Sequence, residues 1–141
     1  VIAQSPDITV IWIGVNDVWH KSSHGTGTDA YKFEKFYRAV IKQLQSNKIK
    51  LMLVTPAVIG EKNDYSNLLD DDLNKYAQII RNIAEDEDIP VCDLHTVFHS
   101  YEINNNLTND YKGILTTDGV HLNDAGNKLA ADEIWKVLKD I

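Results

Sequence analysis

Three short apolar runs alternate with segments of helical periodicity along this chain, and this alternation restricts the fold more than any other feature. The apolar runs are residues 8–14, 49–54 and 91–94. Apolar residues at helical spacing predict helices over about 29–47, 69–84, 96–101 and, near the C-terminus, 124–138. Strands that are connected through helices form parallel sheets with right-handed crossovers. The pattern therefore predicts an α/β protein with a parallel sheet.

The first apolar run, Ile8–Gly14, lacks polar residues at nearly every position. Such strands are usually buried on both faces and have a neighbour on each side. We therefore expect residues 1–141 to be the C-terminal part of a single domain. In this interpretation, a missing N-terminal segment or another chain covers one edge of the first strand, because an open apolar edge promotes aggregation. The alternative is a complete small α/β protein whose first strand is simply hydrophobic.

Composition excludes several classes of protein. With 141 residues, 43% of them hydrophobic, the chain can form one core and hardly two. The 21 acidic and 14 basic residues give a net charge of -7, which argues against nucleic acid or an anionic membrane as partner. No apolar run approaches the length of a membrane-spanning helix. The single cysteine, Cys92, excludes a disulfide framework and a multi-cysteine zinc site, but it does not indicate the cellular compartment.

A first group of candidate functional residues follows the first strand, in the sequence Gly14-Val15-Asn16-Asp17. We expect a polar loop from Asn16 to Thr28. The side-chain amide of Asn16 is a neutral donor that suits the oxyanion of a tetrahedral intermediate. Asparagine and aspartate are also common in plain turns, so turn chemistry alone is the alternative.

A second group precedes the last helix, in the sequence from Asp118 to Asn123. Asp118 and His121 are three residues apart, so in a one-turn loop they can lie on the same side. The carboxylate can then accept the Nδ1 proton of the imidazole and leave Nε2 free as a base. A capping loop with an incidental histidine is the alternative, and in either case Asn123 is the expected N-cap. Because ligands of parallel sheets bind beyond the carboxyl ends of the strands, both groups should converge there.

Together, Gly-x-Asn-Asp after a strand and Asp-Gly-x-His-x-Asn before a C-terminal helix resemble the SGNH (GDSL-like) hydrolase superfamily of esterases and lipases. The resemblance implies a three-layer α/β/α flavodoxin-like fold. It implies that Asn16 is an oxyanion-hole donor, His121 the general base and Asp118 its orienting acid, without any metal or organic cofactor. The nucleophile of this family lies in a Gly-Asp-Ser motif after the first strand, and the 141 residues contain no such motif. We therefore expect the N-terminal strands, and the serine with them, to be missing here.

For other polar and aromatic residues near these motifs, a purely structural role is the alternative to a functional one. Trp19 and Asp17 lie close to Asn16 and are candidates for lining the substrate site, although Trp19 could equally cover the core. His20 and His24 are four residues apart but fall in the expected loop with no third ligand, so we expect no metal site. Ser22 and Ser23 lie in the same loop, and a flexible loop is a poor support for a nucleophile.

The sequence thus favours a serine ester hydrolase that acts on small acyl esters, including acetylated carbohydrates or short-chain lipids, and that is inactive without its missing serine. A second hypothesis is a non-catalytic binding or assembly module of the same fold. A third is a metal-dependent phosphoesterase that uses Asp17, Asp118 and His121.

Overall fold

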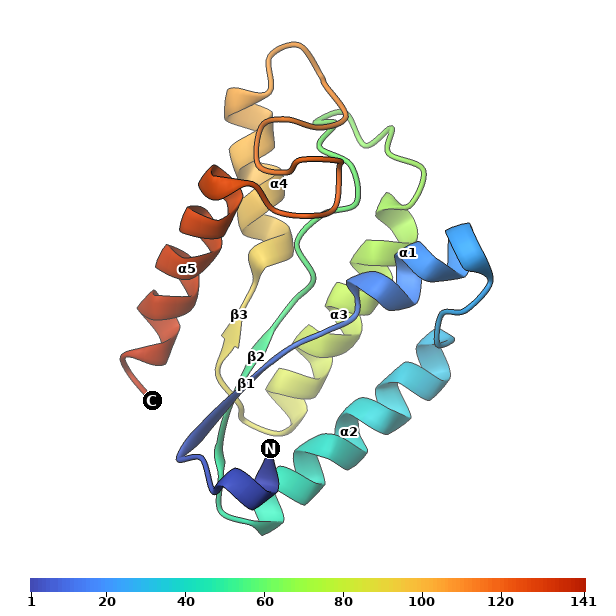
Figure 1. Ribbon diagram of the computed structural model, residues 1–141. Helices are drawn as coiled ribbons and strands as arrows, with labels where there is room; N and C mark the ends of the chain where they lie inside the picture. Colours follow the sequence, from blue (N-terminus) through green and yellow to red (C-terminus); the bar gives the residue numbers. More distant parts are fainter.

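The three expected strands form one parallel sheet with the order β1-β2-β3 (Figure 1). The computed structural model describes all residues from 1 to 141. The strands are β1 (Ile8–Trp12), β2 (Lys50–Val54) and β3 (Val91–Cys92). The helices are α1 (Val15–His24), α2 (Ala30–Ser46), α3 (Asp70–Asp86), α4 (Leu94–Asn105) and α5 (Asp124–Leu138), and a short 3₁₀ helix covers Ile2–Gln4.

The central strand, β2, separates two hydrophobic clusters. Leu51 and Leu53 point into a cluster with side chains of α2 and α3, whereas Met52 and Val54 point into a second cluster with α4 and α5. Successive side chains of a strand point to opposite faces, so a strand that is apolar throughout is covered on both sides. In Figure 1, α2 and α3 lie on one side of the sheet and α4 and α5 on the other. The three-layer α/β/α fold expected from the sequence is present.

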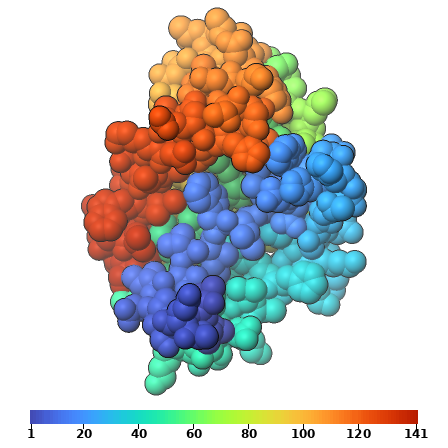
Figure 2. Space-filling model, viewed as in Figure 1, coloured from blue at the N-terminus to red at the C-terminus, as the bar shows by residue number.

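Within residues 1–141 the first strand is buried on one face only, whereas its sequence favours burial on both faces in a larger domain. Ile11 is buried and joins the cluster of α2 and α3, but Val10 and Trp12 on the opposite face are 38% and 41% exposed. The reason is that α5 packs mainly against β3 and leaves that face of β1 partly open. Figure 2 shows the N-terminal segment on the surface, between α5 and α2. The strand pairs with β2 alone, from Ile8 opposite Lys50 onward, so its other edge is open.

The segment after β1 also differs, because the polar loop expected from Asn16 to Thr28 is mostly helix α1. Val18 is buried, and Val15 and Trp19 pack against the core, so three apolar residues at helical spacing hold one face of this helix. Gly25 ends the helix in the left-handed conformation with φ 68°, and its backbone N–H bonds to carbonyls of the last turn.

The C-terminal half follows the expected order with shifted boundaries. β3 has only two residues, because α4 begins at Leu94 with Asp93 as its N-cap, and the helix expected over 96–101 extends to Asn105. Asn123 caps α5 as expected, its side-chain oxygen accepting the N–H of Gly126 at 3.0 Å. No helix combines the length and the hydrophobicity that crossing a bilayer requires.

Candidate active site

A sharp turn at Gly14 places Asn16 in the first turn of α1. Gly14 has φ 122°, which a residue with a side chain rarely adopts, and a Cβ there would lie 3.3 Å from the ring of Phe33. Gly14 is the N-cap of α1 and offers no side chain to the first-turn N–H groups. Asn16 is exposed and belongs to the first turn of α1. Backbone N–H donors and the positive end of the helix dipole lie at this same end of the helix.

Asp118 and His121 are hydrogen-bonded to each other within one turn, as their spacing predicts. One carboxylate oxygen, Oδ2, lies 2.7 Å from Nδ1 of His121. The other, Oδ1, accepts the backbone N–H groups of Val120 at 2.9 Å and His121 at 2.8 Å. The hydrogen bond from the imidazole, followed by those from the two backbone N–H groups, holds the pKa of Asp118 well below its usual range. An ionised carboxylate can only accept, so Nδ1 carries the hydrogen and Nε2 is left with its lone pair.

Trp19 brings the two groups of residues together. Its ring meets that of His121 edge to face, with ring centroids 5.5 Å apart and planes at 81°. Trp19 lies one turn after Asn16 on α1, so the beginning of this helix lies beside the turn that carries the Asp118–His121 pair. Oδ1 of Asp17 accepts the backbone N–H of Thr28 at 3.2 Å and helps to hold the connection to α2.

A buried glutamate that the sequence pattern does not single out supports this turn. Glu61 follows β2, and its side chain is fully buried. Its Oε2 accepts the N–H groups of Ile114 at 2.8 Å and Leu115 at 3.0 Å. Its Oε1 accepts the N–H of Thr116 at 2.5 Å and also the hydroxyl of that threonine. One carboxylate therefore holds three successive residues just before the Asp118–His121 turn.

The turn is also joined to the segment after β2 through two glycines. The N–H of Gly60 donates to the carbonyl of Gly119 at 2.7 Å, and the hydroxyl of Thr116 accepts the N–H of Gly119 at 2.9 Å. Gly119 has φ 100°, and a Cβ there would lie 2.4 Å from the ring of Tyr111. Only glycine fits this position without displacing the tyrosine.

The geometry gives little support to the metal-dependent alternative. No three His, Cys, Asp or Glu side chains are gathered so that they could share one ion, and Asp17, Asp118 and His121 do not form such a group. His20 and His24 lie on a helix rather than in the expected loop, with ring centroids 5.4 Å apart, but no third ligand joins them. The hydroxyl of Ser23 bonds to the carbonyl of Trp19 and approaches Nδ1 of His24, so it does not face His121.

A three-layer α/β/α fold, with an asparagine after one strand and an Asp-x-x-His turn before the last helix, defines a hydrolase fold of the SGNH type. The model of the GDSL-like Lipase/Acylhydrolase family matches residues 1–129, and the chain belongs to this family.

Proteins similar to this chain include acetylxylan esterases. The chain is 29% identical over 136 residues to an acetylxylan esterase of Geobacillus stearothermophilus, covering 93% of this chain and 58% of that protein. It is 55% identical to the acetyl xylan esterase AlAXEase, with a TM-score of 0.95, covering 96% of this chain and 69% of that one. It also matches the acetyl-xylooligosaccharide esterase Axe2 of Geobacillus, at 23% identity and a TM-score of 0.84, covering 98% of this chain and 62% of Axe2.

Proposed function

We propose that this chain forms part of a serine esterase that removes acetyl groups from carbohydrates, with His121 as general base, Asp118 as its orienting acid and Asn16 as an oxyanion donor. The observation that carries the proposal is the 2.7 Å contact between Asp118 and Nδ1 of His121, which leaves Nε2 available as a base. We place the nucleophilic serine outside residues 1–141, because these residues contain no Gly-Asp-Ser motif.

The chemistry assigned to these residues follows the serine hydrolase scheme. Nε2 of His121 takes the serine proton as the serine oxygen attacks the ester carbonyl. Asp118 stays ionised and stabilises the imidazolium, while the amide of Asn16, together with backbone and glycine donors outside residues 1–141, binds the oxyanion. The imidazolium then gives its proton to the sugar oxygen as the bond from that oxygen to the acyl carbon breaks, and the sugar leaves with a free hydroxyl. Water, deprotonated by His121, releases acetate from the acyl-enzyme and restores the serine.

The named relatives support the choice of substrate. AlAXEase, 55% identical, is an acetyl xylan esterase, and the curated relative from Geobacillus carries the same activity in its name. Catalytic mutants of Axe2 replace a serine, an aspartate or a histidine, and the aspartate precedes the histidine by three positions in that enzyme. Asp118 and His121 have the same spacing here.

The test is an assay of the full-length protein on nitrophenyl acetate and on acetylated xylo-oligosaccharides, with acetate release as the readout. His121→Ala should abolish both activities. The matched control is His24→Ala, an exposed histidine on α1, which should leave both unchanged. A folded wild-type protein that hydrolyses neither ester would instead support the non-catalytic binding module.

The open edge of β1 is the remaining part of the proposal. Val10, Trp12 and Ile13 are 38–48% exposed. Together with residues of the 3₁₀ helix and α2, they line a surface beside the open edge, and most of its side chains are apolar. We infer that a further backbone segment, from the same polypeptide or from another chain, pairs with this edge. Hydrogen exchange of the full-length protein should show slow exchange at the β1 amides, and fast exchange along the outer edge would contradict the inference.

A further inference from the structure

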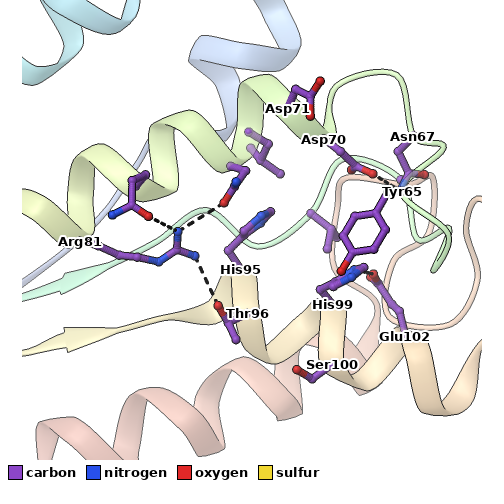
Figure 3. A pocket seen from close by; sticks show the side chains of 15 residues that line it. Tyr65, Asn67, Asp70, Asp71, Arg81, His95, Thr96, His99, Ser100 and Glu102 are labelled. Carbon is purple, nitrogen blue, oxygen red and sulfur yellow. Dashed lines mark hydrogen bonds and ion pairs between the residues drawn. The ribbon is translucent and has the colours of Figure 1, made fainter.

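A cavity lies apart from the Asp118–His121 turn, between α3, α4 and the segment after β2 (Figure 3). Its volume is about 410 Å³, within the usual size range of small-molecule sites. Here it is called the α3–α4 cavity, and its polar wall includes Tyr65, Asp70, His95, His99 and Glu102. The proposed ester chemistry uses none of these side chains.

Two buried polar atoms of residues that line this cavity have no partner within the chain. They are Oε1 of Glu102, whose side chain is almost fully buried, and Nε2 of His99. The two residues approach each other only at 3.9 Å, between Nδ1 of His99 and Oε2 of Glu102. Buried polar groups are nearly always paired with protein, water or a ligand. Two hydrogen-bonding positions beside the cavity are therefore open to water, or to the hydroxyl groups of a ligand, once a small side-chain movement exposes them.

The charges in the cavity disfavour an anionic ligand. The nearby guanidinium, Arg81, is bound by both oxygens of Asp93, at 2.9 and 3.0 Å. Nδ1 of His95 lies 3.0 Å from the carbonyl of Ala57, and burial lowers the pKa of this imidazole, so it is neutral at pH 7. Neither Arg81 nor His95 therefore offers a free positive charge to a phosphate or a carboxylate.

The acidic side chains equally disfavour a cation. Burial, and then the negative charges of Glu61 and Asp70, raise the pKa of Glu102 to about 8, so its carboxyl is neutral at pH 7. Asp70 already accepts a hydrogen bond from Asn67 at 3.1 Å, and burial raises its pKa as well. No group of three ligating side chains is placed to hold a metal ion. The residues that line the cavity are mostly polar, and this favours a neutral ligand with several hydroxyl groups over an acyl chain.

An exposed aromatic ring at the rim of the cavity provides the apolar contact that a sugar ring requires. Tyr65 is 71% exposed, and its ring lies over that of His99 with centroids 4.5 Å apart. Figure 3 shows this ring beside the Glu102 end of the cavity. An aromatic face packs against the C–H face of a sugar ring while neighbouring carboxyl and amide groups bind its hydroxyls.

We propose that the α3–α4 cavity binds a sugar residue of a carbohydrate chain, at a site separate from the ester-hydrolysing turn. The choice of a xylose-based chain rests on the proposed function. Gly60 lines this cavity and also donates its N–H to Gly119 within the Asp118–His121 turn, so the two sites share one segment of backbone. A polymer held at a second point has a higher effective concentration at the first.

The experiment measures binding of linear xylo-oligosaccharides without acetyl groups to the full-length protein, by calorimetry and by NMR titration. Tyr65→Gly removes the ring at a position with φ 59°, which glycine adopts readily, and Glu102→Leu removes the unpartnered carboxyl without leaving a partner behind. Both variants should raise the Kd at least tenfold. The control is Tyr31→Ala, a tyrosine on α2 that is also 71% exposed, and it should not change the Kd.

Two further readouts separate this proposal from the ester chemistry. Hydrolysis of nitrophenyl acetate should be unchanged in Tyr65→Gly and Glu102→Leu, and His121→Ala should still bind the oligosaccharide. Binding without any esterase activity would contradict the proposed function but would support the sugar site. An unchanged Kd in both cavity variants, or no binding by wild-type protein, would overturn the sugar site whatever the esterase assay shows.

Discussion

Replacing Glu61 by glutamine should test how the Asp118–His121 turn is held. The carboxylate of Glu61 accepts two backbone N–H groups on Oε2, and one N–H and a hydroxyl on Oε1. A glutamine can present its oxygen to only one of these pairs, and its NH₂ group then faces donors at the other. With the oxygen kept on the side of Thr116, the N–H groups of Ile114 and Leu115 lose their acceptor.

The magnitude follows from these two orphaned donors. A buried donor left without a partner costs about 1–3 kcal/mol, so Glu61→Gln should lower the free energy of unfolding by roughly 2–6 kcal/mol. Typical domains are stable by about 5–15 kcal/mol, so a folded population should remain at low temperature. Because the loosened residues lead directly into the turn with Asp118 and His121, kcat on nitrophenyl acetate should fall more than KM changes.

Urea denaturation of the full-length protein, with esterase kinetics on the folded fraction, measures both effects. The matched control is Glu85→Gln, the same change at an exposed position of α3, which should alter stability by no more than about 0.5 kcal/mol. If Glu61→Gln matches Glu85→Gln in both stability and kcat, the buried carboxylate does not hold the turn, and the reasoning is refuted.

Three further predictions concern single residues. Because the pKa of Glu102 is raised to about 8 in the folded protein, the native state keeps a proton that the unfolded chain has lost above its ordinary value near 4.5. Stability should therefore fall as pH rises from about 5 to about 8, by up to about 1.4 kcal/mol per pH unit, and urea titrations of Glu102→Gln should show a flatter profile. Gly119→Ala should lower kcat sharply, since its φ of 100° and the ring of Tyr111 leave no room for a Cβ, and an unchanged kcat would contradict the close packing described for this turn. Asn16→Ala should lower kcat about 10²- to 10³-fold with little change in melting temperature, and near-normal turnover would remove Asn16 from the oxyanion hole.

Features that depend on residues close together in the sequence were predicted correctly. The three strands, the cap at Asn123 and the contact between Asp118 and His121 each depend on a few consecutive residues, so the local pattern carries the information. The helix α1 was missed because its Asn, Asp, Ser and His residues suggest a loop. Only Val15, Val18 and Trp19 mark its buried face, and Gly25 marks its end, which together form a short but readable helical signal.

Features that depend on contacts between residues far apart in the sequence could not be predicted. Glu61 lies in a segment that reads as a polar loop, and its partners are more than 50 positions further along the chain. Its burial depends on how the segment after β2 meets the residues before α5, which no periodicity reveals. The partial exposure of β1 is similar, because it depends on which strands α5 covers and not on the residues of β1 itself.

The pairing of Asp118 with His121 inside a single turn has a consequence for the order in which the site is assembled. Closing a short loop loses little chain entropy, and that loss grows with the number of residues between the partners. The acid and the base can therefore meet before the sheet forms, whereas the approach of Asn16 must wait until α1 is folded against the core. The turn, with Gly119 inside it, can thus be transplanted as a unit: a recipient scaffold has to provide a buried acceptor for the three N–H groups that precede the turn.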